Sequence, residues 1–285
     1  MNIKNILRNW IIAALSQPKN SIKVEITQIQ CGEVHANKRI IITGGSKGIG
    51  YAIAEKLIKE GAEVIITGRN EKDLEIAVSN LGEKAHYVVF DSSNIKGIEQ
   101  FLLECDTTFG TIHSIVLNAG ISLHEASFLN VTEESYSKQF DINLKANYFF
   151  AQIFIKYMMN RKVSGSLLFV SSETAGKYND LPYGLTKNAL NSFVGGLARR
   201  VYQCGIRVNA IAPGVTYTNM TKGEHVITDD FANNSSTGRY LLPTEIAEVA
   251  SFILSNSSLC INGETIYCDA GSHLKINGLD HSYSL

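Results

Sequence analysis

Tyr183 and Lys187 are the two residues whose types and spacing point most directly to chemistry. They are four positions apart in a segment with helical periodicity, so both side chains lie on one helix face, about one turn apart. A phenol can exchange a proton with an alcohol oxygen if its pKa falls from about 10 to about 7, which requires roughly 4 kcal/mol. One ammonium about 4 Å away, at an effective dielectric constant of about 20, supplies about that much. The pair therefore predicts an acid/base that is activated by a cation, provided that neighbouring segments supply a substrate site.

A pair of hydroxyls precedes this helix in the chain. Ser171 and Ser172 follow the strand-like segment 166–170, and parallel sheets bind their ligands at the carboxyl ends of their strands. A serine hydroxyl at that edge can donate a hydrogen bond to a carbonyl oxygen while Tyr183 exchanges the proton. We therefore expect Ser172, with Ser171 as the alternative, to complete a set that suits hydride exchange at a carbonyl carbon.

The segment 44–50 is a glycine-rich connection between a strand and a helix. It follows the apolar strand 39–43 and precedes a run of good helix formers, and it reads Gly44-Gly45-Ser46-Lys47-Gly48-Ile49-Gly50. Glycines permit a tight turn and let backbone amides approach a pyrophosphate, whose charge then lies at the helix N-terminus. A nucleotide site is therefore expected here, and an ordinary strand-to-helix connection is the alternative.

The end of the second expected strand indicates which nucleotide. Gly68 stands where NAD-selective folds place an acidic residue for the ribose 2′-hydroxyl. Arg69 follows at once, and Lys47 lies inside the glycine turn, so two cations can converge on a 2′-phosphate. We therefore expect NADP(H) rather than NAD(H). The alternative is that both cations are solvated surface charges.

These groups need a scaffold, which the rest of the chain predicts. From residue 39 onward, short β-rich runs alternate with amphipathic helical stretches, which is typical of an α/β fold with a doubly wound, Rossmann-type parallel sheet of about seven strands between two helical layers. The expected strands are Arg39–Thr43, Glu63–Thr67, Ala85–Phe90, His113–Leu117, Ser166–Val170, Arg207–Ile211 and Glu264–Cys268. The expected helices are Gly50–Glu60, Glu71–Leu81, Ile95–Glu104, Glu133–Met159, Tyr183–Gln203 and Thr244–Leu254. The aperiodic segment 215–242 follows a strand end and is expected to be the substrate lid.

The composition fits one large domain over residues 39–285. With 285 residues, of which 45% are hydrophobic and 19% charged, the chain can bury a full core. Its net charge of −1 supplies no overall field to attract nucleic acid or an anionic membrane, so a nucleic-acid partner is not expected. The five cysteines show no CxxC and no Cys/His spacing suited to zinc, which predicts a cytoplasmic protein with reduced cysteines and no metal site.

Residues 1–38 lie outside the alternation and form an N-terminal extension. Apolar side chains between Ile3 and Leu15 recur at helical spacing opposite a mildly basic face, which predicts an amphipathic helix. The continuous apolar run from Trp10 to Leu15 is too short to cross a membrane. Docking onto the protein's own subunit or an oligomer mate is the simpler interpretation, and attachment to a membrane surface or another protein is the alternative. A short strand over 22–26 is expected to follow.

The order and spacing of these motifs resemble the single-domain branch of the short-chain dehydrogenase/reductase family. The glycine turn has the spacing G-x-x-x-G-x-G after Thr43, and Ser172 and the Tyr-x-x-x-Lys pair follow in the family's order. The match runs roughly from residue 38 to 272 and includes the further marks Asp91, Asn118-Ala119-Gly120, Asn143, Pro213-Gly214, Thr218 and Asp269-Ala270-Gly271.

The resemblance implies a role for each matching residue. Tyr183 is expected to be the acid/base, Ser172 to position the substrate oxygen, and Lys187 also to hold the nicotinamide ribose. Asn143 is expected to anchor a water in the proton relay. The expected cofactor-binding residues are Gly44, Ser46, Lys47, Gly48, Ile49, Gly50, Arg69, Asp91, Asn118, Gly120, Tyr183, Lys187, Pro213, Gly214 and Thr218.

The resemblance implies hydride transfer between NADP(H) and a small carbonyl or secondary alcohol without naming the substrate. The interval from Ser172 to Tyr183 is about two residues shorter than usual, so the loop over the substrate differs. Acyl-carrier-protein reductases rank lower because Cys204 stands where a basic residue is expected, although Lys156 and Arg199-Arg200 can still form a patch. Family members commonly pair through two long helices, so a homodimer or homotetramer is expected. The alternatives are a non-catalytic NADP(H)-sensing module, disfavoured by the retained Tyr and Lys, and a nucleotide-sugar epimerase or dehydratase, disfavoured by the glycine spacing.

Overall fold

The computed structural model describes residues 32–218, 220–221 and 236–274. The chain divides into two compact units, Met1–Gln30 and Cys31–Leu285, and the described residues belong to the second. The amphipathic helix and the short strand expected in the N-terminal extension lie outside the described residues. The same holds for residues 219 and 222–235 of the expected lid.

The last residues of the expected extension pack into the domain. The side chain of His35 is fully buried, and its backbone N–H donates to the carbonyl of Glu60 at 2.8 Å. Its ring Nε2 lies 3.0 Å from the hydroxyl of Ser251. The compact unit therefore begins before the first strand, whereas the alternation of strands and helices had indicated a start at residue 39.

Seven parallel strands form a single sheet, as the sequence predicts. They are β1 (Arg39–Thr43), β2 (Glu63–Gly68), β3 (Ala85–Val89), β4 (Ser114–Leu117), β5 (Gly165–Val170), β6 (Ile206–Pro213) and β7 (Thr265–Cys268). Their order across the sheet is β3-β2-β1-β4-β5-β6-β7. The order reverses between β1 and β4, and in such sheets ligands bind beyond the carboxyl ends of the strands at that reversal.

The central strands are buried on both faces, which explains their continuous apolar runs. Ile41 of β1 pairs with Ile65 of β2 on one side and with Ile115 of β4 on the other, and all three side chains are fully buried. Successive residues of β1 point to opposite faces, so Ile41 joins one core and Ile40 and Ile42 join the other. A strand covered by helices on both faces has no solvent side and therefore no polar alternation.

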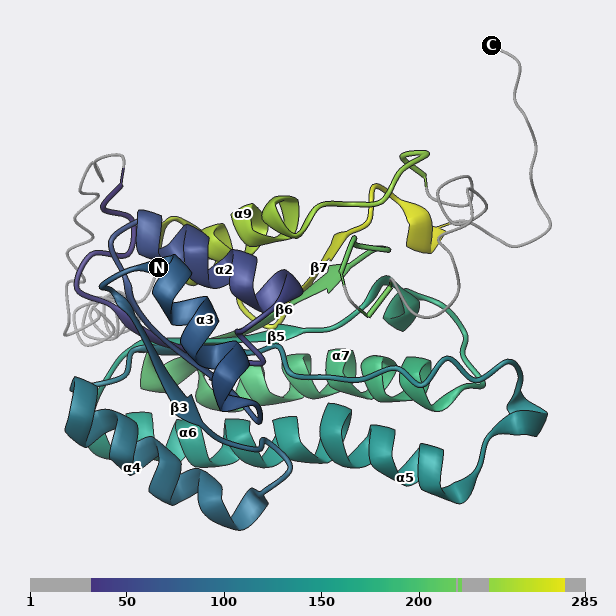
Figure 1. Cartoon of the computed structure of the whole chain (residues 1–285), viewed down its shortest axis with the longest axis horizontal. Coiled ribbons are helices and arrows are strands. Elements are labelled where there is room, and N and C mark those ends of the chain that lie inside the picture. The colour runs from purple at the N-terminus through teal and green to yellow at the C-terminus, as the bar shows by residue number, and fades with distance from the viewer. Residues whose placement is uncertain (1–31, 219, 222–235, 275–285) are drawn as a thin grey trace, which may run out of the picture. The chain divides into compact units, whose positions relative to one another are not determined.

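Helices cover both faces of the sheet (Figure 1). One face carries α2 (Gly48–Lys59), α3 (Glu71–Leu81) and α9 (Pro243–Leu254). The other face carries α4 (Ile98–Phe109), α6 (Asn147–Arg161) and α7 (Pro182–Val201), and α5 (Glu133–Phe140) leads into α6. Within the described ranges, no helix combines the length and the apolar character that crossing a membrane would require.

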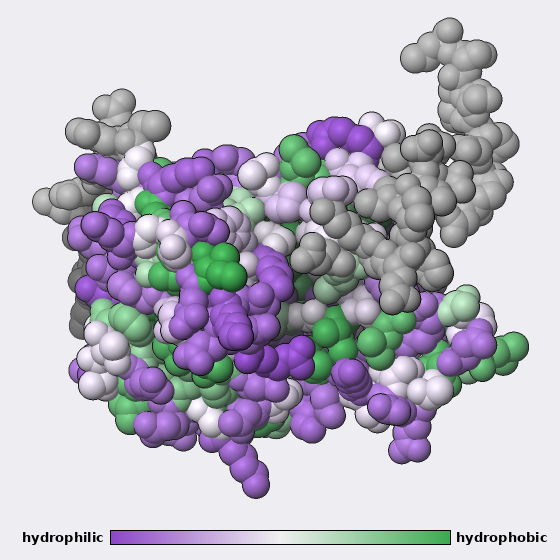
Figure 2. Space-filling view, in the orientation of Figure 1, coloured by the Kyte–Doolittle hydropathy of each residue, from purple (hydrophilic) through white to green (hydrophobic). Residues whose placement is uncertain are grey.

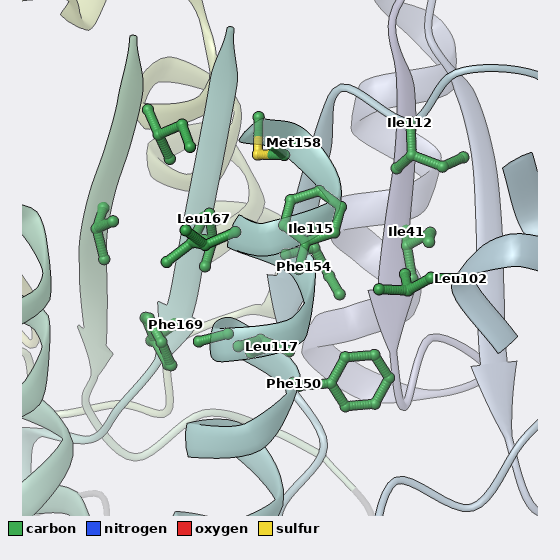
Figure 3. Close-up of a cluster of buried hydrophobic side chains, with 14 of the residues drawn as sticks. Ile41, Leu102, Ile112, Ile115, Leu117, Phe150, Phe154, Met158, Leu167 and Phe169 are labelled. Carbon is green, nitrogen blue, oxygen red and sulfur yellow. The ribbon is translucent and has the colours of Figure 1, made fainter. Parts of the chain in front are cut away.

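The core between the sheet and α6 fixes the helix that leads to the site. Phe150 and Phe154 of α6 are fully buried and belong to one cluster with Phe169 of β5 (Figure 3). Burial of an aromatic side chain of this size contributes about 1.5–3 kcal/mol relative to leaving it exposed. These contacts hold α6 against the sheet and thereby set the position of the turn just before it.

That turn is the main departure from the expected elements. The segment Glu133–Met159, expected as one helix, consists of α5 and α6 joined by a π-helical turn, Asp141–Ala146. A π-helical turn contains one extra residue per turn, and such turns are frequent at functional sites. Asn143 lies within it.

Candidate active site

Tyr183 lies at the start of α7, where the helix meets the carboxyl edge of the sheet. The helix begins with Pro182 at its first position, where the missing N–H has no helical partner to lose and the fixed φ favours the helical conformation. Tyr183 is the second residue, and Lys187 is the next residue on the same face. The structure therefore brings the predicted pair together at the carboxyl edge of the sheet, where sheets of this kind bind ligands.

The structure distinguishes the two serines that follow β5. The hydroxyl of Ser172 hydrogen bonds to Tyr183, and it also accepts from the backbone N–H of Thr174 at 3.3 Å. The hydroxyl of Ser171 turns the other way and donates to Oδ1 of Asn191 at 2.7 Å. Ser172 is thus the serine beside the phenol, and Ser171 fastens the end of β5 to α7.

Lys187 is buried beneath the site, with only 4% of its surface exposed. Its Nζ donates to the carbonyl of Val170 at 2.9 Å and lies 5.6 Å from the centroid of the Tyr183 ring. Burial disfavours the ammonium and lowers the pKa of Lys187 from 10.5 to about 8. Lys187 is therefore a cation that burial destabilises, held at the end of β5 by its hydrogen bond to Val170.

The pKa of Tyr183 departs from the expectation drawn from the spacing. Burial raises the pKa of the phenol above its ordinary value, the hydrogen bond from Ser172 lowers it, and the charge of Glu173 raises it. Without cofactor the desolvation of the phenol outweighs the nearby ammonium, because Lys187 lies on the ring face and directs a hydrogen bond to Val170. The expected depression of the pKa towards 7 is therefore absent from the protein without its cofactor.

Asn143 fixes the loop that leaves β4. Its Oδ1 accepts from the backbone N–H of Ile121 at 2.8 Å, and its Nδ2 donates to the Ile121 carbonyl at 2.8 Å and to Oγ1 of Thr186 at 3.3 Å. Its own carbonyl accepts from Nδ2 of Asn147 at 2.7 Å. A Cβ on Gly120 would lie 3.2 Å from Asn143 Oδ1 and 3.5 Å from Lys187 Nζ, so glycine leaves the approach to both groups open. The expected role of Asn143 in holding a water remains a prediction.

Sequence reasoning missed several polar partners of these residues. Asn191 and Asn147 follow Lys187 and Asn143 by four positions, so they extend polar stripes on the same helix faces. Asn191 accepts from Ser171 and donates to the hydroxyl of Tyr267 at 3.2 Å. The four-residue spacing was the available signal, since buried amides at that interval need partners.

The glycine turn has a conformation that requires glycine at several of its positions. Gly44 and Gly48 adopt positive φ angles of 64° and 57°, which side-chain-bearing residues rarely adopt. A Cβ on Gly50 would lie 2.4 Å from the carbonyl of Gly44, so only glycine lets the start of α2 pack against the turn. Thr218 reaches this turn from beyond β6, because its methyl group lies 3.3 Å from the position of a Cβ on Gly48.

Asn118 ties the two strands at the sheet's reversal point. Its Nδ2 donates to the carbonyls of Thr43 and Gly44, each at 3.0 Å. The hydroxyl of Thr43 in turn accepts from the backbone N–H groups of Asn118 and Ala119, each at 3.0 Å. This closed set of hydrogen bonds holds the glycine turn against the end of β4.

The two predicted phosphate cations differ in their surroundings. Nζ of Lys47 lies 2.7 Å from Oδ2 of Asp73, in the first turn of α3. Arg69 is exposed and makes no hydrogen bond or ion pair with the residues that the structure describes. Asp91, at the end of β3, is exposed and accepts from the backbone N–H of Ser93 at 2.9 Å. All three lie on the half of the sheet formed by β1, β2 and β3, beside the glycine turn.

The chain after β6 crosses the same edge. Pro213 is buried at the end of β6, and the N–H of Gly214 donates to the carbonyl of Cys268 at 2.9 Å. Asp269 is buried after β7 and accepts from Nδ1 of His273 at 2.8 Å. The bond from Gly214 to Cys268 joins the ends of β6 and β7, and the contact of Asp269 with His273 fixes the segment that follows β7.

The loops around the site expose apolar side chains. Leu123, Phe128 and Leu129, between β4 and α5, are exposed, and Figure 2 shows hydrophobic side chains interspersed with hydrophilic ones on this face of the domain. Nε2 of His124 lies 3.2 Å from the carbonyl of Met220, so this loop also contacts the chain beyond β6. The edge that carries Tyr183 is therefore bordered by apolar as well as polar groups.

The chain is similar to known oxidoreductases. A family model described as Enoyl-(Acyl carrier protein) reductase matches residues 44–273, which include Ser172, Tyr183 and Lys187. The L-rhamnose 1-dehydrogenase (NADP(+)) of Thermoplasma acidophilum is 33% identical over 250 residues, covering 82% of this chain and 95% of that protein. The 3-oxoacyl-(acyl-carrier-protein) reductase FabG of Chlamydia muridarum is 34% identical over 246 residues, covering 82% of this chain and 97% of that protein.

Solved structures are similar over the same region. The crystal structure of 3-ketoacyl-(acyl-carrier-protein) reductase from Brucella melitensis complexed with NADH has a TM-score of 0.78 at 26% sequence identity. The similarity covers 84% of this chain and 99% of that one.

Proposed function

The chain belongs to the short-chain dehydrogenase/reductase family, and on that premise we propose that it transfers a hydride between NADP(H) and a carbonyl or secondary alcohol. Tyr183 is the acid/base, Ser172 positions the substrate oxygen, and Lys187 supports both the phenol and the nicotinamide ribose. The observation that carries the proposal is the convergence of the Ser172 and Tyr183 hydroxyls above a buried lysine one helical turn away.

The residues present fit a dinucleotide. The glycines between Gly44 and Gly50 let the turn pack closely against its neighbours, since a Cβ on Gly45 or Gly50 would collide with Ile66 or with the Gly44 carbonyl. The amides of the turn lie at the N-terminus of α2, where a pyrophosphate is stabilised. NADP(H) is supported by Gly68 in place of an acid, by the exposed Arg69, and by a relative whose name specifies NADP(+). When bound, the nicotinamide supplies or accepts the hydride.

The protein's residues supply the proton and hold the substrate oxygen. In reduction, Tyr183 gives its proton to the carbonyl oxygen while Ser172 donates a hydrogen bond to the same oxygen. The ammonium of Lys187 stabilises the phenolate that remains, because it lies 5.6 Å from the ring centroid in a site of low dielectric. Asn143 holds the loop at Ile121 beside this group and is proposed to anchor a water that returns the proton.

The raised pKa of Tyr183 keeps the phenol in neutral solution in the protonated form that reduction needs. A phenol whose pKa is raised by burial stays protonated at neutral pH and is ready to donate. Oxidation of an alcohol needs the phenolate, which forms more readily at higher pH or beside the positive charge of an oxidised nicotinamide. The two directions should therefore differ in pH dependence, with oxidation rising as pH increases.

We also propose a homodimer or homotetramer that works in the cytoplasm on a small-molecule substrate. Tyr136 of α5 and Tyr148 of α6 are exposed aromatic residues, and Tyr148 stacks on Phe193 of α7 at 4.7 Å between ring centroids. An apolar face across these helices supports pairing with a second copy. The relatives include an enzyme named for rhamnose and one named for 3-oxoacyl groups, so the shared site indicates the reaction rather than the substrate.

The test is consumption of NADPH against a chemically diverse carbonyl library. The proposal expects turnover with at least one class of ketone or aldehyde. A non-catalytic NADP(H) sensor would bind the cofactor without turnover. A nucleotide-sugar epimerase or dehydratase would retain the cofactor through purification and show no net consumption. Either of those results would overturn the proposed function.

A further inference from the structure

Lys47, one of the two cations expected at the 2′-phosphate, forms an ion pair with Asp73. Its Nζ lies 2.7 Å from Oδ2 of Asp73, and the side chains are 54% and 30% exposed. Lys47 caps α2 beside the glycine turn, whereas Asp73 lies in the first turn of α3, after Arg69 and the capping residue Asn70. The ion pair therefore bridges the two segments between which the adenosine ribose of a dinucleotide would lie.

The pair changes the charge that a 2′-phosphate meets. Lys47 and Arg69 together offer two positive charges, and Asp73 reduces the sum over these three residues to one. A phosphate that recruits Lys47 must draw it away from Asp73 or share it with that carboxylate. Exposed ion pairs of this kind contribute about 0.2–1 kcal/mol, so the competition is modest in size.

We propose that Asp73 is a specificity-determining residue that weakens discrimination in favour of NADP(H) by holding Lys47. This inference rests on the proposed use of NADP(H). NADH carries no 2′-phosphate, so Lys47 keeps its partner when NADH binds and Asp73 does not affect that affinity. Asp73 thus acts through Lys47 and reduces the difference in binding affinity between NADPH and NADH.

The test is a double-mutant cycle on NADPH and NADH affinity, measured by fluorescence titration of the full-length protein. Asp73→Asn should tighten NADPH about two- to fivefold and leave NADH unchanged. In the Lys47→Ala background the same substitution should give no gain, because the residue through which Asp73 acts is missing. Asp73→Glu, which keeps the ion pair, should behave like the wild type.

A matched control removes a comparable carboxylate elsewhere. Glu55 of α2 forms an exposed ion pair with Lys59 at 3.1 Å, two helical turns beyond the glycine turn. Glu55→Gln changes the net charge as Asp73→Asn does and should leave both affinities unchanged. An equal gain from Glu55→Gln would assign the effect to net charge and overturn the proposal.

Other outcomes separate this proposal from the cofactor proposal. Weaker or unchanged NADPH binding by Asp73→Asn, or an equal gain in the Lys47→Ala background, would overturn the role of Asp73. The wild-type ratio of NADPH to NADH affinity tests the cofactor proposal by itself, since a preference for NADH would refute NADP(H). The change in affinity caused by Asp73→Asn is measured relative to the wild-type affinity for the same cofactor, so it does not depend on which cofactor the wild type prefers.

Discussion

Replacing Lys187 by Met should stabilise the cofactor-free protein while removing its activity. The pKa of Lys187 falls from 10.5 to about 8 because the ammonium is buried. This difference corresponds to about 3 kcal/mol by which the charged lysine destabilises the folded state at neutral pH. Methionine also loses the hydrogen bond to the Val170 carbonyl, which costs about 1 kcal/mol. The expected net gain at pH 7 is about 2 kcal/mol in the free energy of unfolding.

The sign of the pH dependence follows from the lowered pKa. Below pH 8 the lysine is charged in both the folded and the unfolded states, so the destabilisation is complete there. As the pH rises from about 8 to 10.5, the folded protein releases the proton while the unfolded chain keeps it, and the destabilisation disappears. The advantage of Lys187→Met should therefore shrink steadily over that range.

Urea unfolding at pH 7 and pH 9.5, at one fixed protein concentration, measures both effects. Lys156→Met removes an exposed lysine of α6 and serves as the matched control, with no change expected at either pH. Turnover by Lys187→Met should fall at least about 100-fold. If Lys187→Met were less stable than the wild type at pH 7, the conclusion that burial of the Lys187 ammonium destabilises the fold would be refuted. The same would follow if the variant gained equal free energy of unfolding at both pH values.

Two further predictions concern the cofactor and the serines. Arg69→Ala should weaken NADPH about 10- to 100-fold and leave NADH unchanged, because the lost charge-assisted hydrogen bonds involve only the 2′-phosphate; titration of both cofactors checks this, and equal losses would contradict it. Ser172→Ala should lower kcat about 100-fold or more. Ser171→Ala removes the hydrogen bonds of the hydroxyl to Oδ1 of Asn191 and to the Lys187 carbonyl, so it should keep kcat within a few-fold and cost about 1 kcal/mol of stability. Steady-state kinetics and urea unfolding on both variants decide between them, and a larger loss of kcat in Ser171→Ala would reverse the assignment.

The fold was accessible from the sequence because the pattern that selects it is local. The run Val64-Ile65-Ile66 and its counterparts in the other strands indicated buried parallel strands, and all seven strands lie where they were expected. The limits of the strands shifted by one or two residues at several ends, as at β6, which continues to Pro213. Such ends depend on contacts with neighbouring strands, which the periodicity of one segment does not contain.

The site was predictable as a set of residues but not in its energetics. The i, i+4 spacing places Tyr183 and Lys187 on one helix face in any helix, and the structure brings them together with Ser172. The carbonyl that Lys187 binds and the degree of its burial depend on how α7 packs against β5. The direction of the phenol pKa therefore could not be derived from spacing alone.

The π-helical turn and the start of the domain were missed for similar reasons. One extra residue at Asp141–Ala146 leaves the apolar periodicity of the flanking helices intact, so the sequence predicts a single helix. His35 precedes the first strand by four residues and looks like a linker residue, yet its burial against Ser251 depends on a helix more than 200 positions away. Neither the π-helical turn nor the burial of His35 produces a pattern in the nearby sequence from which it could be predicted.

Transfer of label from NADPH deuterated at C4 of the nicotinamide tests the central claim most directly. The measurement is mass spectrometry of the alcohol formed from a carbonyl that the wild type reduces, with Tyr183→Phe as the comparison. We expect one deuterium at the carbinol carbon in the wild-type product. Tyr183→Phe should bind NADPH with nearly unchanged affinity and form product at least about 100-fold more slowly. Product without deuterium, or a rate for Tyr183→Phe above about a tenth of the wild-type rate, would contradict hydride transfer with Tyr183 as the acid/base.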